Sequence, residues 1–205
     1  SDEALGLYLW NEELSAGLYR AFSTLEDVMR NQFHRALSAR YGVNGSPASR
    51  DWYLHLRLTP MSMQKIQELL SFRKRVKGAF VWVPRTPVPR PDDVVSKLTF
   101  GFWQHLFDVT HDTSGAPVGW GDIIPDIVPG HRQKQSAYWR QQIYQDELFA
   151  RIDLCKELRN RVAHHEPVWK FGELLEERRE RQHRPPRTVL EPSPTTPGDA
   201  LRRLS

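Results

Sequence analysis

The sequence predicts an all-α protein, most simply a bundle of packed helices with extra loops, followed by a disordered tail. Apolar residues recur at steps of three and four over several long segments, which is the spacing of one face of an α-helix. No series of alternating apolar and polar residues indicates a sheet. The C-terminal segment is rich in proline and arginine, a composition typical of disorder. We expect one helical domain over residues 1–183 and a disordered tail over residues 184–205.

The first two predicted helices each have an apolar stripe. The first covers residues 4–39, with room for a break near Asn11, and its stripe consists of Leu18, Phe22, Leu25, Met29, Phe33 and Ala36. The second begins at Pro60 with Thr59 as its N-cap, ends in the basic run 73–77 and stops at Gly78. Its stripe consists of Met63, Ile66, Leu69 and Leu70, with Phe72 as an extension. The apolar run 80–83 and the prolines after it are expected to form an extended connector.

Helical segments are also predicted in the second half of the chain. Asp92 and Asp93 are expected to cap a helix that contains Val95, Leu98, Phe102 and Leu106. Residues 108–131 are rich in glycine, proline and aspartate, which predicts a long loop that holds a short helix or shapes a surface. A long helix is predicted from Gln133 to Ala163, and a polar helix over residues 172–182.

The net charge of +4 belongs to the C-terminal part of the chain. From residue 178 onward, seven arginines stand against three acidic residues, and the rest of the chain is neutral overall. Overall basicity is therefore no argument for nucleic-acid binding by the folded body. No apolar run is long enough to cross a membrane, the first residues do not resemble a signal peptide, and the single cysteine, Cys155, excludes an internal disulfide. We expect a cytoplasmic protein that does not bind membranes.

The segment "ELRNRVAHHEPVW", residues 157–169, places polar residues at the end of the long helix. At 100° per residue, Arg159 falls within the apolar stripe of Leu148, Ile152, Cys155 and Val162, where a guanidinium needs a compensating anion. Arg159 and His164 lie about 140° apart on one ideal helix, so one copy of the helix does not direct both side chains at a single atom. They converge only in an open groove or beside a second copy.

Two interpretations of this segment remain open from the residues alone. An arginine that holds a phosphate and a histidine that moves protons suffice for attack of a ribose 2′-hydroxyl on the adjacent phosphodiester, without metal or cofactor. In the other interpretation, Arg159 pairs with a carboxylate inside the bundle while His164 and His165 end the helix. A metal site at His164, His165 and Glu166 is disfavoured because adjacent histidines point to different sides of a helix. Serine or cysteine nucleophile motifs and a phosphate-binding glycine loop are absent from the sequence.

Three blocks of the sequence resemble the HEPN superfamily, and specifically its Abi-like (abortive infection) branch. "RNRVAH" has the arginine and histidine of that superfamily's ribonuclease motif, with four residues between them, and the full string "LRNRVAHHEPVW" resembles the Abi-like branch. "YLWNEELSAGLYRAFSTLEDVMRN" and "KLTFGFWQHLF" resemble the same branch, and Glu26, Arg30 and Asn31 match its first long helix. The blocks follow the family's order over residues 8–169.

The resemblance implies a helical bundle that forms a homodimer, with the motif helices facing each other across a cleft. It also implies metal-independent RNA cleavage in phage defence or as a toxin, with an antitoxin or another defence-system protein as a further partner. Arg159 would stabilise the pentacoordinate phosphorus, His164 would act as general acid or base, and Asn160 would orient the substrate or the histidine. His165 is an alternative to His164.

Three residues of the first helix remain accessory candidates in that resemblance, namely Glu26, Arg30 and Asn31. Glu26 and Arg30, four apart, fit an ordinary helix ion pair equally well. His34, one turn later, is expected to be packed or at the surface rather than catalytic. A noncatalytic RNA-binding or regulatory module of the same family is the alternative function.

Overall fold

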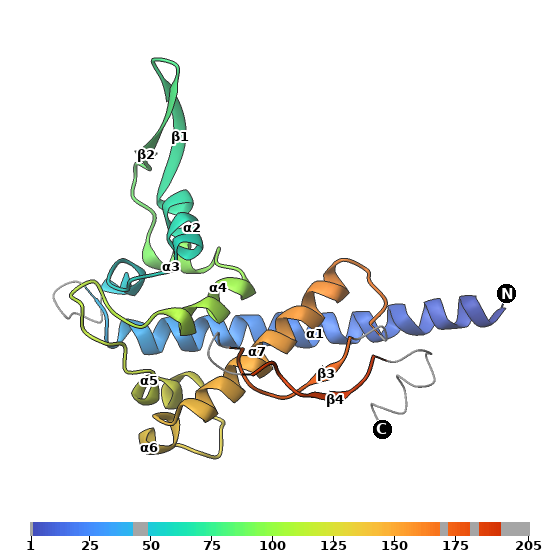
Figure 1. The fold of residues 1–205 in the computed structure, drawn as a ribbon. Helices are drawn as coiled ribbons and strands as arrows, with labels where there is room; N and C mark the ends of the chain where they lie inside the picture. Colours follow the sequence, from blue (N-terminus) through green and yellow to red (C-terminus); the bar gives the residue numbers. More distant parts are fainter. Residues whose placement is uncertain (1, 43–48, 169–171, 181–184, 194–205) are drawn as a thin grey trace. The chain divides into compact units, whose positions relative to one another are not determined.

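The computed structural model describes the chain except residues 1, 43–48, 169–171, 181–184 and 194–205, and the fold is mostly helical (Figure 1). Contacts group the chain into two compact units. The terminal unit comprises Ser1–Leu25 and Gln142–Ser205, and the central unit comprises Glu26–Gln141. The long helix α1, Asp2–Ser38, contributes residues to both units.

Helix α1 confirms the first predicted helix and its apolar face. Phe22, Met29, Phe33 and Ala36 are buried, while Leu18 and Leu25 are half-buried. The helix is continuous through Asn11, so the break considered there does not occur. Burial of this face stabilises the helix over residues 18–36 more than intrinsic propensity does.

The terminal unit is built around helix α7, Gln142–Ala163, and the first part of α1. Its core contains Phe22, Val162 and Val168, with half-buried apolar side chains packed around them, namely Leu14, Leu18, Leu25, Cys155 and Leu158. Two short antiparallel strands complete the unit, β3 at Leu174–Leu175 and β4 at Val189–Glu191.

These two strands correct the expectations for the C-terminal segment. The polar helix predicted over residues 172–182 is absent from its described part, where β3 lies instead. Strand β4 lies inside the predicted disordered tail, whose residues 184 and 194–205 fall outside the described chain. Proline-rich backbone lacks N–H donors but offers carbonyls, and Arg178 donates to the carbonyl oxygens of Pro185 and Pro186 over 2.6 and 2.8 Å. Arg178 thus holds this segment against the chain that follows β3.

The central unit packs short helices around an aromatic core. Trp52 and Trp103 are fully buried, with ring centroids 6.2 Å apart, and Phe33 of α1 lies 5.8 Å from the Trp103 ring. The elements around this core are η3 Trp52–Leu54, α2 Pro60–Leu70, α3 Pro91–Val95, α4 Phe100–His105, η4 Leu106–Asp108, α5 Trp120–Ile127 and α6 Ser136–Trp139.

A β-hairpin in the central unit shows that the all-α prediction was wrong in part. Helix α2 starts at Pro60 with Thr59 as its N-cap, as predicted, but ends at Leu70 instead of continuing to Gly78. Strands β1, Ser71–Val76, and β2, Ala79–Pro84, follow and pair antiparallel. The two residues between them, Lys77 and Gly78, have φ values of 49° and 88°. Positive φ at both positions is what a two-residue type I′ turn requires.

Two other long helices of the sequence prediction are interrupted in the structure. The helix expected from Asp92 is two short helices, α3 and α4, although Val95, Leu98, Phe102 and Leu106 are all buried as expected. The helix expected over residues 133–163 is α6 followed by α7. The loop expected over 108–131 contains helix α5. Among the described helices, none has the length and apolarity needed to cross a membrane.

Candidate functional site

The predicted catalytic histidines lie where helix α7 ends. His164 follows the last helical residue, and its backbone N–H still donates to the Asn160 carbonyl over 2.9 Å. His165 has a φ of 55°, its N–H donates to Val162, and the next N–H, of Glu166, donates to the Arg161 carbonyl over 2.9 Å. This pair of hydrogen bonds is the Schellman arrangement, in which His165 takes the left-handed position usually occupied by glycine. Both histidine side chains are exposed.

Arg159 and Asn160 lie one turn before the histidines and are both half-buried. Nη1 of Arg159 lies 3.5 Å from Oδ1 of Asn160, so the guanidinium and the amide are adjacent. The apolar stripe predicted around Arg159 is confirmed, since Ile152 and Val162 are buried and Cys155 is half-buried. The guanidinium is therefore partly shielded from water, which strengthens its attraction for an anion, but it is not sealed from solvent.

One lysine on this part of α7 pairs with two acidic side chains. Nζ of Lys156 lies 2.9 Å from Asp153 and 3.0 Å from Glu157. Burial, the largest single influence, acts to lower the pKa of Lys156, but the hydrogen bonds and charges of the two carboxylates outweigh it and raise the pKa. Lys156 thus stays charged and offsets one of the two negative charges that Asp153 and Glu157 bring to this part of α7.

Asn11 of α1 fixes the segment that follows the histidines. Its buried side-chain oxygen accepts a hydrogen bond of 2.8 Å from the backbone N–H of Val168, directly after Pro167. This role of Asn11 was not predicted from the sequence. The signal was present, because Asn11 stands three and seven residues before Leu14 and Leu18 and so places a polar side chain on an apolar helix face.

The accessory candidates of α1 belong to the central unit. Arg30 is half-buried and forms an ion pair with Asp27 over 3.1 Å. Glu26 is half-buried and Asn31 is exposed. Arg30 thus has an ion-pair partner on its own helix, Asp27, whereas the sequence predicted a pair with Glu26.

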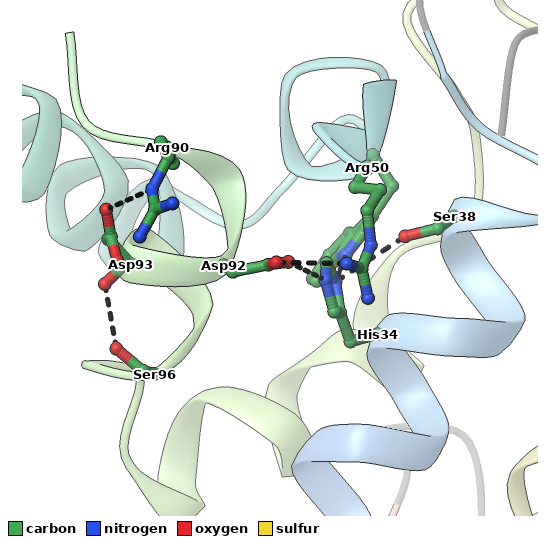
Figure 2. Close-up of polar contacts among 8 residues, drawn as sticks. His34, Ser38, Arg50, Arg90, Asp92, Asp93 and Ser96 are labelled. Atoms are coloured by element: carbon green, nitrogen blue, oxygen red, sulfur yellow. Dashed lines mark hydrogen bonds and ion pairs between the residues drawn. The ribbon is translucent and has the colours of Figure 1, made fainter. Parts of the chain in front are cut away.

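His34 has the packed position expected of it and joins three segments of the central unit (Figure 2). Its Nδ1 accepts a hydrogen bond of 2.9 Å from Nε1 of Trp52, and its Nε2 lies 2.9 Å from Oδ1 of Asp92. Because the indole nitrogen can only donate, the imidazole proton must be on Nε2, which donates to Asp92. The other oxygen of Asp92 accepts from Arg50 over 2.9 Å. With both ring nitrogens engaged, His34 serves packing rather than proton transfer.

Cys155 is expected to react slowly with alkylating reagents in the folded protein. It packs against the core of the terminal unit, and burial raises the pKa of its thiol. A raised pKa means that the thiol binds its proton to a higher pH in the folded than in the unfolded chain, so less reactive thiolate is present at a given pH. This difference in pKa contributes to the stability of the folded chain. The contribution is fully present below the pKa of the thiol in the unfolded chain, about 8.5, and it is lost as the pH rises through the pKa of the thiol in the folded chain.

The measurement is the rate of iodoacetamide labelling at pH 8 with and without urea. Labelling should be at least about tenfold slower without urea. Equal rates would contradict the packed position of Cys155.

Comparison with known proteins gives no match to a family model, to a curated protein or to a solved structure. Within the described residues, no cluster of three or more histidine, cysteine, aspartate or glutamate side chains has the arrangement of a metal site.

Proposed function

We propose that the chain is a metal-independent endoribonuclease of the HEPN type, of the Abi-like branch, in which Arg159 and His164 act on the scissile phosphate. The observation behind the proposal is the position of the two side chains at the end of α7. Arg159 is half-buried beside Asn160, and the imidazole of His164 is exposed one turn later. The reaction requires a positive group that binds the phosphate and an accessible group that transfers protons, and the guanidinium and the imidazole are groups of these two kinds.

The reaction needs no group beyond the side chains and the substrate. The ribose 2′-oxygen bonds to phosphorus while a base accepts the 2′-hydroxyl proton, and the bond from phosphorus to the 5′-oxygen breaks as an acid gives that oxygen a proton. The products are a 2′,3′-cyclic phosphate and a 5′-hydroxyl. Arg159 stabilises the extra negative charge on the pentacoordinate phosphorus, and Asn160 orients the substrate or the imidazole.

A homodimer would solve the geometric problem posed by one helix. His164 and Arg159 diverge by about 140° on an ideal helix, so the second copy of α7 would contribute the missing group at each phosphate. It would also supply the second imidazole for the two proton transfers. On this proposal, the cytoplasmic protein is a toxin or an abortive-infection effector in antiviral defence, and an antitoxin or another defence-system protein would restrain it.

The test is cleavage of total RNA in the presence of excess chelator. The wild-type chain should still cut, leaving cyclic phosphate ends, and Arg159→Ala should reduce the rate by about 10²- to 10³-fold because it removes the charge that stabilises the transition state. Arg161→Ala is the matched control, since it removes the same charge two residues along the same helix. Cleavage that disappears with chelator, or that Arg159→Ala leaves intact, would overturn the proposal.

The alternative is a noncatalytic RNA-binding or regulatory module of the same fold. The exposed basic and aromatic hairpin of the central unit favours this alternative, because it offers binding chemistry without catalytic groups. RNA retained in a gel-shift assay without any cleavage by the wild-type chain would support it.

A further inference from the structure

The β1–β2 hairpin exposes two chemically different faces. Residues opposite each other in an antiparallel pair share a face, so Arg73 and Arg75 of β1 lie with Trp82 and Phe80 of β2. We call this set the arginine–aromatic face. The opposite face is formed by Phe72, Lys74, Val76, Ala79, Val81 and Val83.

The side chains of the arginine–aromatic face are exposed and contact one another. Phe80 is 62% exposed and Trp82 is 36% exposed. The guanidinium of Arg73 lies 5.4 Å from the centroid of the Phe80 ring and 5.6 Å from that of the Trp82 ring. These cation–π contacts hold the two rings and the charge together on one surface. Exposed aromatic rings held in this way are typical of binding surfaces.

The charge of the hairpin specifies an anionic partner. Residues 69–90 contain six basic side chains and no acidic one, with the basic side chains at Arg73, Lys74, Arg75, Lys77, Arg85 and Arg90. The neutral overall charge of residues 1–177 conceals this local excess. A surface that combines positive charge with open aromatic faces is complementary to a ligand that has both phosphates and stackable rings.

We propose that the arginine–aromatic face binds single-stranded RNA, with bases stacked on Phe80 and Trp82 and phosphates paired with Arg73 and Arg75. Arginines two residues apart on one strand stand about 6.6 Å apart, which allows each to reach a different phosphate. The choice of RNA over DNA rests on the proposed function, whereas the binding of a single strand does not.

Two other partners fit the hairpin less well. Double-stranded RNA has a major groove too deep and narrow for side chains to read, and its paired bases cannot stack on Phe80 or Trp82. A hairpin that inserts into a bilayer needs an apolar tip, whereas Lys77 lies in the turn between β1 and β2.

The test is fluorescence anisotropy with a labelled 2′-O-methyl RNA single strand. This probe lacks the 2′-hydroxyl and cannot be cut by the proposed reaction, so binding is measured whether or not the protein is a nuclease. Phe80→Ala and Trp82→Ala should each weaken binding by about tenfold. The double variant Arg73→Gln/Arg75→Gln should reduce the slope of log affinity against log salt by about 1.4, since each phosphate contact contributes about 0.7.

Matched controls lie on the opposite face of the same strands. Phe72→Ala removes the same side chain as Phe80→Ala, and Lys74→Gln removes one charge, as does Arg73→Gln alone. Both controls should change affinity by less than about twofold. Equal weakening by Phe72→Ala and Phe80→Ala would overturn the proposal, as would tighter binding to an RNA duplex or to phosphatidylserine vesicles. If the wild-type chain binds the probe but cleaves no RNA, the proposed nuclease activity is contradicted and the proposed RNA binding by the hairpin is not.

Discussion

The His164→Ala variant is expected to cleave RNA about 10²- to 10⁴-fold more slowly than the wild-type chain, the usual contribution of a general acid or base. Its stability should be almost unchanged. The His164 side chain is exposed, and the hydrogen bond that it makes within α7 comes from its backbone N–H, which alanine retains. The comparison is the initial rate of cleavage of a labelled RNA, with the thermal unfolding of both chains as the check on folding.

The neighbouring histidine provides the control. His165 occupies the left-handed position of the Schellman turn, where glycine is favoured, so His165→Gly keeps the end of the helix and removes only the imidazole. It should change the free energy of unfolding by less than about 1 kcal/mol and leave cleavage intact. If His165→Gly abolishes cleavage while His164→Ala does not, the second histidine of the pair is the proton carrier. Full activity in both variants would place proton transfer elsewhere.

The long helices were predictable because periodic apolar residues were sufficient evidence. In α1, the stripe from Leu18 to Ala36 specifies both the helix and the buried face, and in α7 the same pattern placed Arg159 among apolar neighbours. Ends and breaks were less predictable, since they depend on local geometry. Arg140 and Gln141, which separate α6 from α7, are ordinary helix formers, so nothing in their propensity marks the interruption.

The hairpin was missed because its first strand also fits a helix. Phe72 continues the spacing of Ile66 and Leu69, and the basic run after it is typical of a last helical turn. Gly78 is equally consistent with a helix stop and with a two-residue strand turn. Only the pairing of β1 with the β-branched and aromatic run of β2 decides between them, and that pairing is a tertiary contact that local spacing does not contain.

The catalytic roles in the candidate site stay a prediction, and the surroundings of the site were only partly predictable. The motif spacing selected Arg159, Asn160 and His164 as candidates, and the structure places them at the end of α7. Asn11 was not found, although it fixes the chain after Pro167 through Val168. That contact spans most of the sequence, so it depends on the packing of α1 against the segment after α7, within the terminal unit.

In the central unit, His34→Ala is expected to lower the free energy of unfolding by about 3 kcal/mol. The substitution leaves a cavity beside the fully buried Trp52 and removes the acceptor of the indole N–H. An unpaired buried donor costs about 1–3 kcal/mol, and the lost packing adds to that cost. Urea unfolding followed by far-ultraviolet circular dichroism measures the change. Arg50→Ala, at the half-exposed outer end of the same network, should cost less than about 1 kcal/mol.

A double-mutant cycle with Trp52→Phe separates the two parts of that loss. Phenylalanine fills much of the indole volume but has no N–H, so His34→Ala then leaves no donor unpaired. If the hydrogen bond to Nδ1 contributes, His34→Ala should cost about 1 kcal/mol less in the Trp52→Phe chain than in the wild-type chain. An equal cost in both chains would mean that His34 stabilises the central unit by filling space and through Asp92, and that its bond to Trp52 adds nothing.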